Sequence, residues 1–276
     1  MAGLRYATYP TTQERFSRLA DLRSDVRKLA ATMQRLGKGV RVIPYKYNEW
    51  LAELGNGDHD DFLMLDQEGE SESFGGTPTL DIARRIMSHA SRNDKLGCAE
   101  AAWNASVHST MLDEAWHYSA HRDATRWDSI TTAAIEPQEL VPEMTQRERV
   151  RSKKADFAIS LELGEETERQ LAQSSIQLNQ TTYEGIRFNP IAVSIETKLP
   201  GEGGSDAKLQ LATWSCSQIA KLRELLALAG NRDCPIPPLP LIIIQGHDWH
   251  FLCLEDRRDC AVRKHLRMRS LFVSKY

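Results

Sequence analysis

Five short apolar segments between residues 129 and 255 limit the possible folds more than any other feature. They cover residues 129–136, 155–163, 190–198, 240–246 and 249–255, and each reads as a strand. One long helix, from about Asp206 to Ala229, is expected between the third and the fourth segment. Strands interrupted by a helix in this way indicate an α/β chain.

Two glycine-containing connections mark turns between these segments. Gly246, His247 and Asp248 separate the last two strands and predict a tight hairpin. The "GHDWH" letters there favour a turn with a cross-strand histidine over a metal site, because no third ligand is suitably spaced. The "GEGGS" stretch at 201–205 lacks the Gly-Lys-Ser/Thr ending of a phosphate-binding loop, so it predicts a connection from a strand to the long helix.

The first third of the chain predicts a helical extension followed by an acidic linker. Residues 11–37 carry apolar positions at alternating steps of three and four, behind a possible capping box at Thr11 and Glu14. This seam either packs on the domain or forms a homodimer contact. Gly55–Thr77 is typical of a loop. We therefore expect an extension over residues 1–78 and a main domain over residues 79–276.

A second helical block is predicted from about Thr79 to Ser119, with a break near residues 93–97. In its last part, Glu100, Asn104 and His108 follow one another at intervals of four residues. Residues spaced in this way share one helix face. Polar groups therefore lie along or beside the packing face of this helix.

Composition places the protein among globular chains of the cell interior. Its 276 residues are 41% hydrophobic, enough for a sizeable core, and no apolar run approaches the roughly 20 residues that cross a bilayer. The five cysteines are scattered without a CxxC pair, which argues against a disulfide framework. We expect an intracellular protein, in the nucleus or cytoplasm, that does not associate with a membrane.

Charge is distributed unevenly, although the formal net charge is only −3. Residues 49–74 hold nine acidic side chains and no Lys or Arg, so the remainder of the chain carries +6. Basic clusters stand at 147–154 and 257–275. Each is either a solvated surface or a surface that faces phosphate groups.

Three side chains near strand ends predict a metal site. Glu196 and Lys198 share one face of their strand, and Asp156 opens an earlier strand. If these two strands pair antiparallel, the two carboxylates meet at one sheet edge. Asp156, Glu196 and the backbone carbonyl of Thr197 would then form an oxygen site suited to Mg²⁺ or Mn²⁺.

These residues resemble the PD-(D/E)XK nuclease superfamily. The resemblance rests on the ordered segments "CAEAAWNASVHSTML", "KKADFAISL", "SIETK", "LQLATW" and "GHDWHF", which run from about Cys98 to Leu254. Within that superfamily, the chain most resembles the fungal PD-(D/E)XK nuclease-like domain proteins. The resemblance implies a restriction-endonuclease-like mixed β-sheet flanked by helices, with the N-terminal helical extension added to it.

The same resemblance implies roles for individual residues. Asp156 and Glu196 would bind the metal, and Lys198 would be the catalytic lysine. Glu100 would assist the metal or its water, and Gln210 would orient the lysine or the substrate. Alternatively, Glu196 and Lys198 form a simple ion pair, and Gln210 and His108 are ordinary helix residues with satisfied hydrogen bonds.

Two functions are compatible with this sequence. The first is a Mg²⁺-dependent nuclease that hydrolyses phosphodiester bonds in DNA, with Arg151, Lys153 and Lys154 contacting the nucleic acid. The second is a restriction-fold protein with changed chemistry, which binds a partner or acts on a small molecule. A cationic groove over Asp156 would favour the first, and a closed apolar pocket lined by Trp103 and Trp214 would favour the second.

Overall fold

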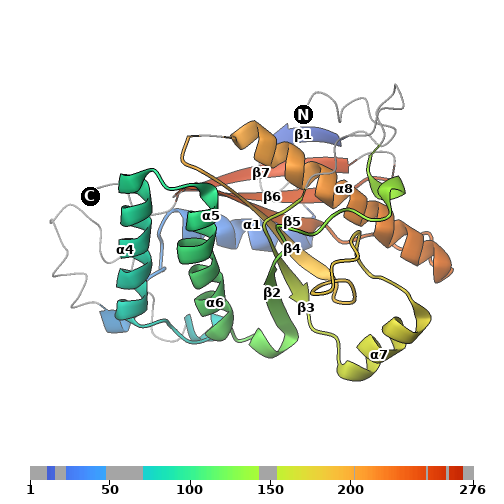
Figure 1. Ribbon diagram of the computed structural model, residues 1–276, viewed down its shortest axis with the longest axis horizontal. Coiled ribbons are helices and arrows are strands. Elements are labelled where there is room, and N and C mark those ends of the chain that lie inside the picture. The colour runs from blue at the N-terminus through green and yellow to red at the C-terminus, as the bar shows by residue number, and fades with distance from the viewer. Residues whose placement is uncertain are drawn as a thin grey trace.

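One mixed sheet organises the protein. The computed structural model describes residues 11–15, 23–47, 71–142, 154–201, 203–246, 248–258 and 261–269, and within these ranges seven strands pair in the order β1-β7-β6-β5-β4-β3-β2 (Figure 1). The strands are β1 Thr11–Arg15, β2 Thr125–Ser129, β3 Phe157–Leu161, β4 Ile191–Lys198, β5 Leu239–Gln245, β6 Asp248–Asp256 and β7 Ala261–Arg269. The β1–β7 and β4–β5 pairs are parallel, and the other neighbours are antiparallel.

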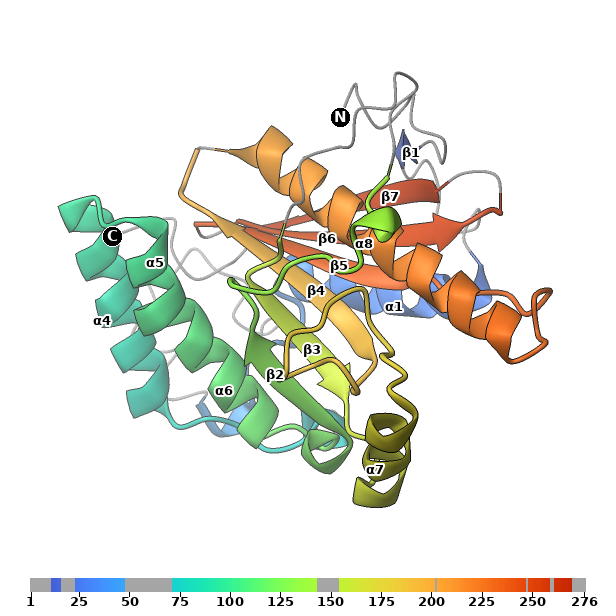
Figure 2. The same ribbon diagram turned by 45° about the vertical axis from the view of Figure 1, so that its right-hand side comes forward.

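Helices cover both faces of this sheet. The longest, α8 Gly204–Leu228, crosses one face, and α1 Ser24–Gly37 lies behind the sheet (Figures 1 and 2). The remaining helices are α4 Leu80–Leu96, α5 Glu100–Trp103, α6 Ser109–His117 and α7 Glu165–Ser174, and a π-helical segment, η5 Asn104–His108, joins α5 to α6. Short 3-10 turns lie at η3 Tyr45–Tyr47, η4 Ser71–Phe74, η6 Arg122–Ala124 and η7 Gln138–Leu140. The predicted mixed sheet flanked by helices is confirmed.

The alternation of side chains along β5 separates the two layers of the core. Leu241 and Ile243 pack with the cluster that includes Trp214 of α8, and the next residue, Ile244, packs with Leu112 of α6. Successive strand residues point to opposite faces, so a run of apolar residues fills both layers. None of the described helices combines the length and hydrophobicity needed to cross a membrane.

Most predicted elements are found close to the expected positions. The helical block beginning near Thr79 breaks after α4 at Gly97, whose φ of 59° is the left-handed cap that glycine favours. The hairpin between β5 and β6 pairs Gln245 with Asp248 as expected. The stretch between β3 and β4 contains α7 and then packs Ile186 fully into the core.

Two predicted elements are wrong in part. Residues 11–15 form a strand, and the described helix begins only at Ser24, because Thr11–Arg15 pairs with β7 from the other end of the chain. The predicted strand over 129–136 overlaps β2 only at Ser129. Beyond it, Ile130 and Ile135 are fully buried in irregular backbone, so their apolar character reflects core packing rather than a strand.

The N-terminal helix packs on the main body of the protein. Val26 and Ala30 of α1 are buried together with Cys253 of β6, whereas Leu29 and Leu36 remain 38% and 36% exposed. The division into residues 1–78 and 79–276 stays a prediction, and most of the acidic segment over 49–74 lies outside the described residues.

Candidate active site

The pairing of β3 with β4 brings the predicted carboxylates to one place. The strands are antiparallel, with Phe157 opposite Ile195, so the start of β3 lies beside the end of β4. The backbone N–H of Asp156 donates to the carbonyl of Ile195 at 3.0 Å. The antiparallel arrangement on which the predicted site depended is therefore present.

Lys198 connects three oxygen acceptors at the end of β4. Its Nζ donates to Glu196 Oε1 at 2.6 Å, to the Thr197 carbonyl at 2.7 Å and to Glu100 Oε2 at 3.2 Å. Glu196 and Lys198 share a strand face as expected, and Glu100 reaches the lysine from the first residue of α5. The Lys198 side chain is only 14% exposed, so these contacts are shielded from solvent.

A glycine in the connection after β4 gives the lysine its space. Gly203 has a φ of 63°, and a Cβ at this position would lie 2.7 Å from Lys198 Cδ. Residues other than glycine rarely adopt this backbone conformation, and a side chain would also displace the lysine. The glycine-rich connection from strand to helix therefore helps to shape the site.

Burial perturbs the ionisation of both charged residues on β4. The pKa of Glu196 is raised to about 8, first by burial and then by the nearby Asp156 carboxylate, with Lys198 opposing the shift. Burial by itself would lower the pKa of Lys198, but the carboxylates of Glu196, Glu100 and Asp156 outweigh burial and raise it. Glu196 Oε2 is buried without a hydrogen-bond partner in the described part of the chain.

Thr197 holds the other carboxylate. Asp156 Oδ2 lies 2.8 Å from both the backbone N–H and the hydroxyl of Thr197, which donate to it. The same hydroxyl lies 2.8 Å from Asn104 Oδ1, and this oxygen lies 2.9 Å from His108 Nδ1. Only the backbone carbonyl of Thr197 was predicted from the sequence to belong to the site. The four-residue spacing of Glu100, Asn104 and His108 was the signal that pointed to this helix face.

The residues just described form one cluster: Glu100, Asp156, Glu196, Thr197 and Lys198. The other predicted residues make fewer contacts with this cluster. Gln210 donates a long hydrogen bond of 3.5 Å to the carbonyl of Lys154, so it lies beside the backbone that leads into Asp156. Lys154 is exposed, whereas Arg151 and Lys153 lie outside the described residues. The orienting role of Gln210 and the nucleic-acid contacts stay predictions.

Comparison with known proteins agrees with this geometry. A family model described as the PD-(D/E)XK nuclease superfamily matches residues 51–271. The chain belongs to the PD-(D/E)XK nuclease superfamily. Neither the comparison with curated proteins nor the comparison with solved structures gave a match.

PD-(D/E)XK nucleases generally use divalent metal ions, and the charges of this cluster fit such an ion. Three carboxyl groups, from Glu100, Asp156 and Glu196, face the single ammonium of Lys198, so the cluster carries an excess of two negative charges once all three are ionised, as they would be with a metal bound. The buried and unpartnered Glu196 Oε2 is the kind of hard oxygen ligand that Mg²⁺ and Mn²⁺ prefer. Within the described residues, no set of three or more His, Cys, Asp and Glu side chains is grouped closely enough to bind a metal alone. A bound ion would therefore also need the Thr197 carbonyl, water or substrate oxygens.

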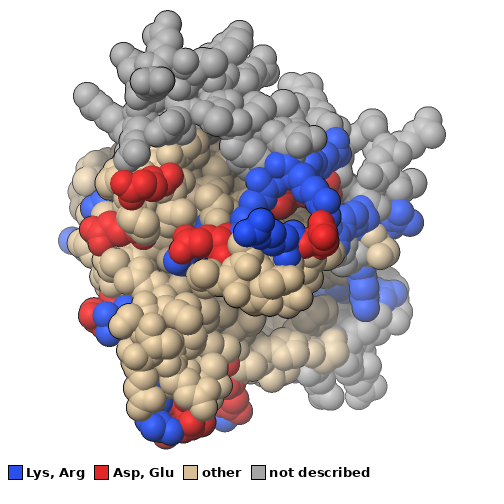
Figure 3. Space-filling view, turned by 90° about the vertical axis from the view of Figure 1, so that its right-hand side faces the viewer, with Lys and Arg blue, Asp and Glu red and all other residues tan. Residues whose placement is uncertain are grey.

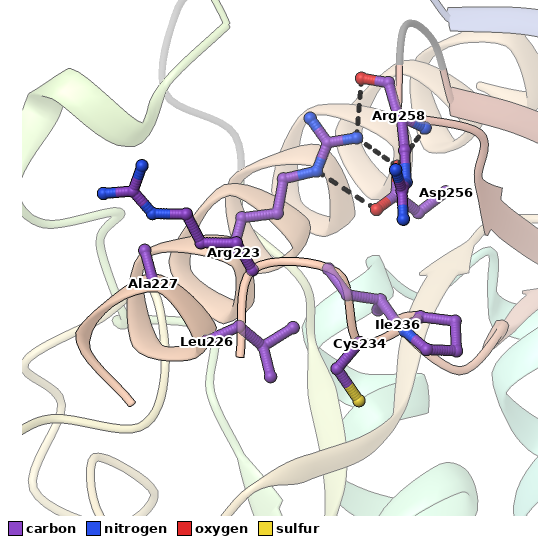
Figure 4. Close-up of a pocket in the computed structure, with 9 residues that line it drawn as sticks. Arg223, Leu226, Ala227, Cys234, Ile236, Asp256 and Arg258 are labelled. Carbon is purple, nitrogen blue, oxygen red and sulfur yellow. Dashed lines mark hydrogen bonds and ion pairs between the residues drawn. The ribbon is translucent and has the colours of Figure 1, made fainter. Parts of the chain in front are cut away.

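A separate cavity of about 360 Å³ lies at the other end of α8 from this cluster (Figure 4). The helix has 25 residues and is therefore about 37 Å long. Lys and Arg side chains gather on this side of the molecule, together with acidic groups (Figure 3). Arg223, which lines the cavity, is bound to the Asp256 carboxylate through two nitrogens and to the Arg258 carbonyl. The cavity is thus remote from the cluster around Lys198.

Proposed function

We propose that this protein is a divalent-metal-dependent nuclease that hydrolyses phosphodiester bonds in DNA. The observation that carries the proposal is the contact of Lys198 Nζ with both Glu196 and Glu100, beside Asp156, in a chain of the PD-(D/E)XK superfamily. This set combines excess negative charge for a metal with one fixed cation for the substrate. Asp156, Glu196 and the Thr197 carbonyl would hold Mg²⁺ or Mn²⁺. When bound, the ion would supply Lewis acidity and lower the pKa of a coordinated water.

The chain's own residues perform the remaining tasks. The Lys198 ammonium is held in place by two carboxylates, and it is suited to stabilise negative charge that develops on the phosphate during attack. Glu100 is 35% exposed and so remains accessible to water from which it would accept a proton. Gln210 and Lys154 would lie along the approach of the substrate, together with Arg151 and Lys153.

Burial of the two tryptophans disfavours the alternative of a small-molecule site. Trp214 is fully buried in the core layer under α8, and Trp103 is 4% exposed in a different cluster with Ala90 and Val107. They therefore do not line one shared apolar pocket. If the protein does not cleave DNA, we would instead infer a restriction-fold protein with changed chemistry.

Three finer assignments belong to the same proposal. Within the superfamily, we place the chain nearest to the fungal PD-(D/E)XK nuclease-like domain proteins, on the five ordered segments of sequence. We expect it to act in the nucleus or the cytoplasm. A homodimer through the N-terminal helix would use the exposed Leu29 and Leu36 of α1, since Val26 packs inward.

Cleavage of plasmid, linear and single-stranded DNA with Mg²⁺ or Mn²⁺ tests the proposal. We expect the wild type to cut at least one of these, and Lys198→Ala to lose cleavage while still binding DNA, because one lysine contributes little to overall affinity. Lys221→Ala is the matched control: Lys221 is also a buried lysine, paired with Glu224 at 3.1 Å away from the cluster, and should cut normally. Absence of metal-dependent cleavage and of DNA binding in the wild type would contradict the proposal.

A further inference from the structure

The helix that carries Glu100 changes its hydrogen-bonding pattern beside the active site. Between α5 and α6, residues Asn104–His108 form a π-helical turn, in which hydrogen bonds run from residue i to i+5. Such turns are rare, occur mostly inside α-helices and are frequently found at functional sites. Here the turn begins and ends with polar residues, Asn104 and His108, and it faces the end of β4.

These two residues continue the contacts of the cluster into the protein interior. His108 is 3% exposed and Thr197 is fully buried. His108 Nδ1 lies 2.9 Å from Asn104 Oδ1, which in turn lies 2.8 Å from the Thr197 hydroxyl. The hydroxyl lies 2.8 Å from Asp156 Oδ2. An unbroken polar chain therefore joins a buried histidine to a predicted metal ligand.

The number of available protons determines which hydrogen bonds these polar groups can form. The Thr197 hydroxyl has one proton and two acceptors at equal distance, Asp156 Oδ2 and Asn104 Oδ1. The hydroxyl shares this one proton between the two acceptors, and it therefore bridges Asn104 and Asp156 and sets the rotamer of Thr197. The backbone N–H of Thr197 donates a separate hydrogen bond to the same Asp156 oxygen. Asp156 Oδ1 accepts no hydrogen bond from the described residues. The arrangement thus fixes one carboxylate oxygen and leaves the other for a ligand.

We propose that Asn104 and His108 are positioning residues, which orient the Asp156 carboxylate toward a divalent cation through the Thr197 hydroxyl. The proposal rests on the proposed nuclease function and deepens it. Neither residue touches the metal. Residues that orient metal ligands in this way typically contribute ten- to hundredfold to metal affinity. A purely structural role would instead change the stability of the fold and leave metal affinity unaltered.

Calorimetric titration of metal-free protein with Mn²⁺ separates these two roles. We expect Thr197→Val, Asn104→Ala and His108→Leu each to weaken Mn²⁺ binding about tenfold or more. Two conservative variants should restore affinity to within about threefold of wild type: Thr197→Ser keeps the hydroxyl, and His108→Asn keeps a hydrogen-bonding nitrogen close to the position of Nδ1. The double variant Asn104→Ala/Thr197→Val should bind no more weakly than the weaker of its single variants, because both residues act along one path.

Matched controls come from buried residues of the same types that lie outside the series of polar contacts from His108 to Asp156. Thr213 is fully buried and donates to the Leu209 carbonyl, and Asn179 is 1% exposed and donates to the Asn189 carbonyl. Thr213→Val and Asn179→Ala should keep Mn²⁺ affinity within about threefold of wild type, a bound well below the tenfold expected for positioning residues.

The outcomes distinguish this inference from the proposed function. If folded Asn104→Ala and His108→Leu bind Mn²⁺ as tightly as wild type, the positioning role is wrong and the nuclease proposal stands. If the wild type neither binds Mn²⁺ nor cleaves DNA, both are wrong. Should Thr197→Val fail to fold, the His108→Leu and His108→Asn pair decides, because equal affinities in the two would overturn the inference.

Discussion

Glu196 is a carboxylate that the metal-free protein does not keep charged at neutral pH. Its pKa is about 8 in the folded protein, against an ordinary value of 4.5, because it is fully buried and Asp156 lies nearby. A carboxyl group whose pKa rises on folding stabilises the folded state most below the pKa of the unfolded chain, here pH 4.5. Its contribution then falls as the pH rises toward 8, because the unfolded chain ionises first.

Glu196→Gln should therefore change how stability depends on pH. As the pH rises from about 5 to 7.5, the free energy of unfolding of the variant should increase relative to wild type by about 1.4 kcal/mol for each pH unit. This slope corresponds to one proton bound by folded but not by unfolded wild type. Denaturant unfolding of both proteins without metal, at several pH values, measures this difference. Glu224→Gln, which changes a half-exposed carboxylate paired with Lys221, is the control. A constant difference between Glu196→Gln and wild type would show that the Glu196 pKa is not raised.

The main residues of the cluster were predictable, but their supporting residues were not. Asp156, Glu196 and Lys198 could be placed together from strand alternation and antiparallel pairing alone, and Glu100 from the superfamily resemblance. The Thr197 hydroxyl and the Asn104–His108 pair were missed as parts of the site. Their contacts depend on where the helix meets β4 and on a π-helical turn, and neither feature follows from local sequence.

Local sequence patterns predicted helices and strands correctly where the tertiary contacts favour the same secondary structure. The apolar runs of β4, β5 and β6 pair with one another and are buried on both faces, so composition and structure coincide there. Residues 11–15 show the opposite case. Their helix-start spacing is overridden by pairing with β7, a partner about 250 residues away in sequence.

The helix α8 should contribute stability through its inner face alone. Leu211 is 1% exposed in the core cluster that includes Trp214, whereas Leu228 at the end of the same helix is 72% exposed. Leu211→Ala should lower the free energy of unfolding by about 2–5 kcal/mol, and Leu228→Ala by about 0.5 kcal/mol or less. Urea unfolding measures both. Equal losses in the two variants would contradict the assigned packing of α8.

For the molecule as a whole, the distribution of charge decides whether DNA can bind. Reversing Arg151, Lys153 and Lys154 to Glu should weaken DNA binding before it affects the chemistry, because phosphate neutralisation supplies most non-specific affinity. Binding by the wild type should fall steeply with salt, and the triple variant should show a smaller slope. Fluorescence anisotropy with labelled DNA at several salt concentrations measures both effects.

A second triple reversal tests whether the position of the charge matters. Arg122 and Arg187 precede β2 and β4, and Arg169 lies within α7, so all three belong to segments at the end of the β3–β4 pair away from Asp156. Changing them to Glu alters net charge by the same amount, but should reduce DNA affinity much less. Equal losses in the two triple variants would show that net charge, and not a surface beside Asp156, governs binding.

The nuclease function requires that the cluster of Glu100, Asp156, Glu196 and Lys198 bind a divalent cation. Calorimetric titration with Mn²⁺ at pH 7, in two buffers of different ionisation enthalpy, tests it most directly. Because the Glu196 pKa is about 8, binding should release close to one proton per ion from the wild type, and Glu196→Gln should bind far more weakly without that release. Absence of saturable Mn²⁺ binding to the wild type, or equal binding by Glu196→Gln, would contradict the account.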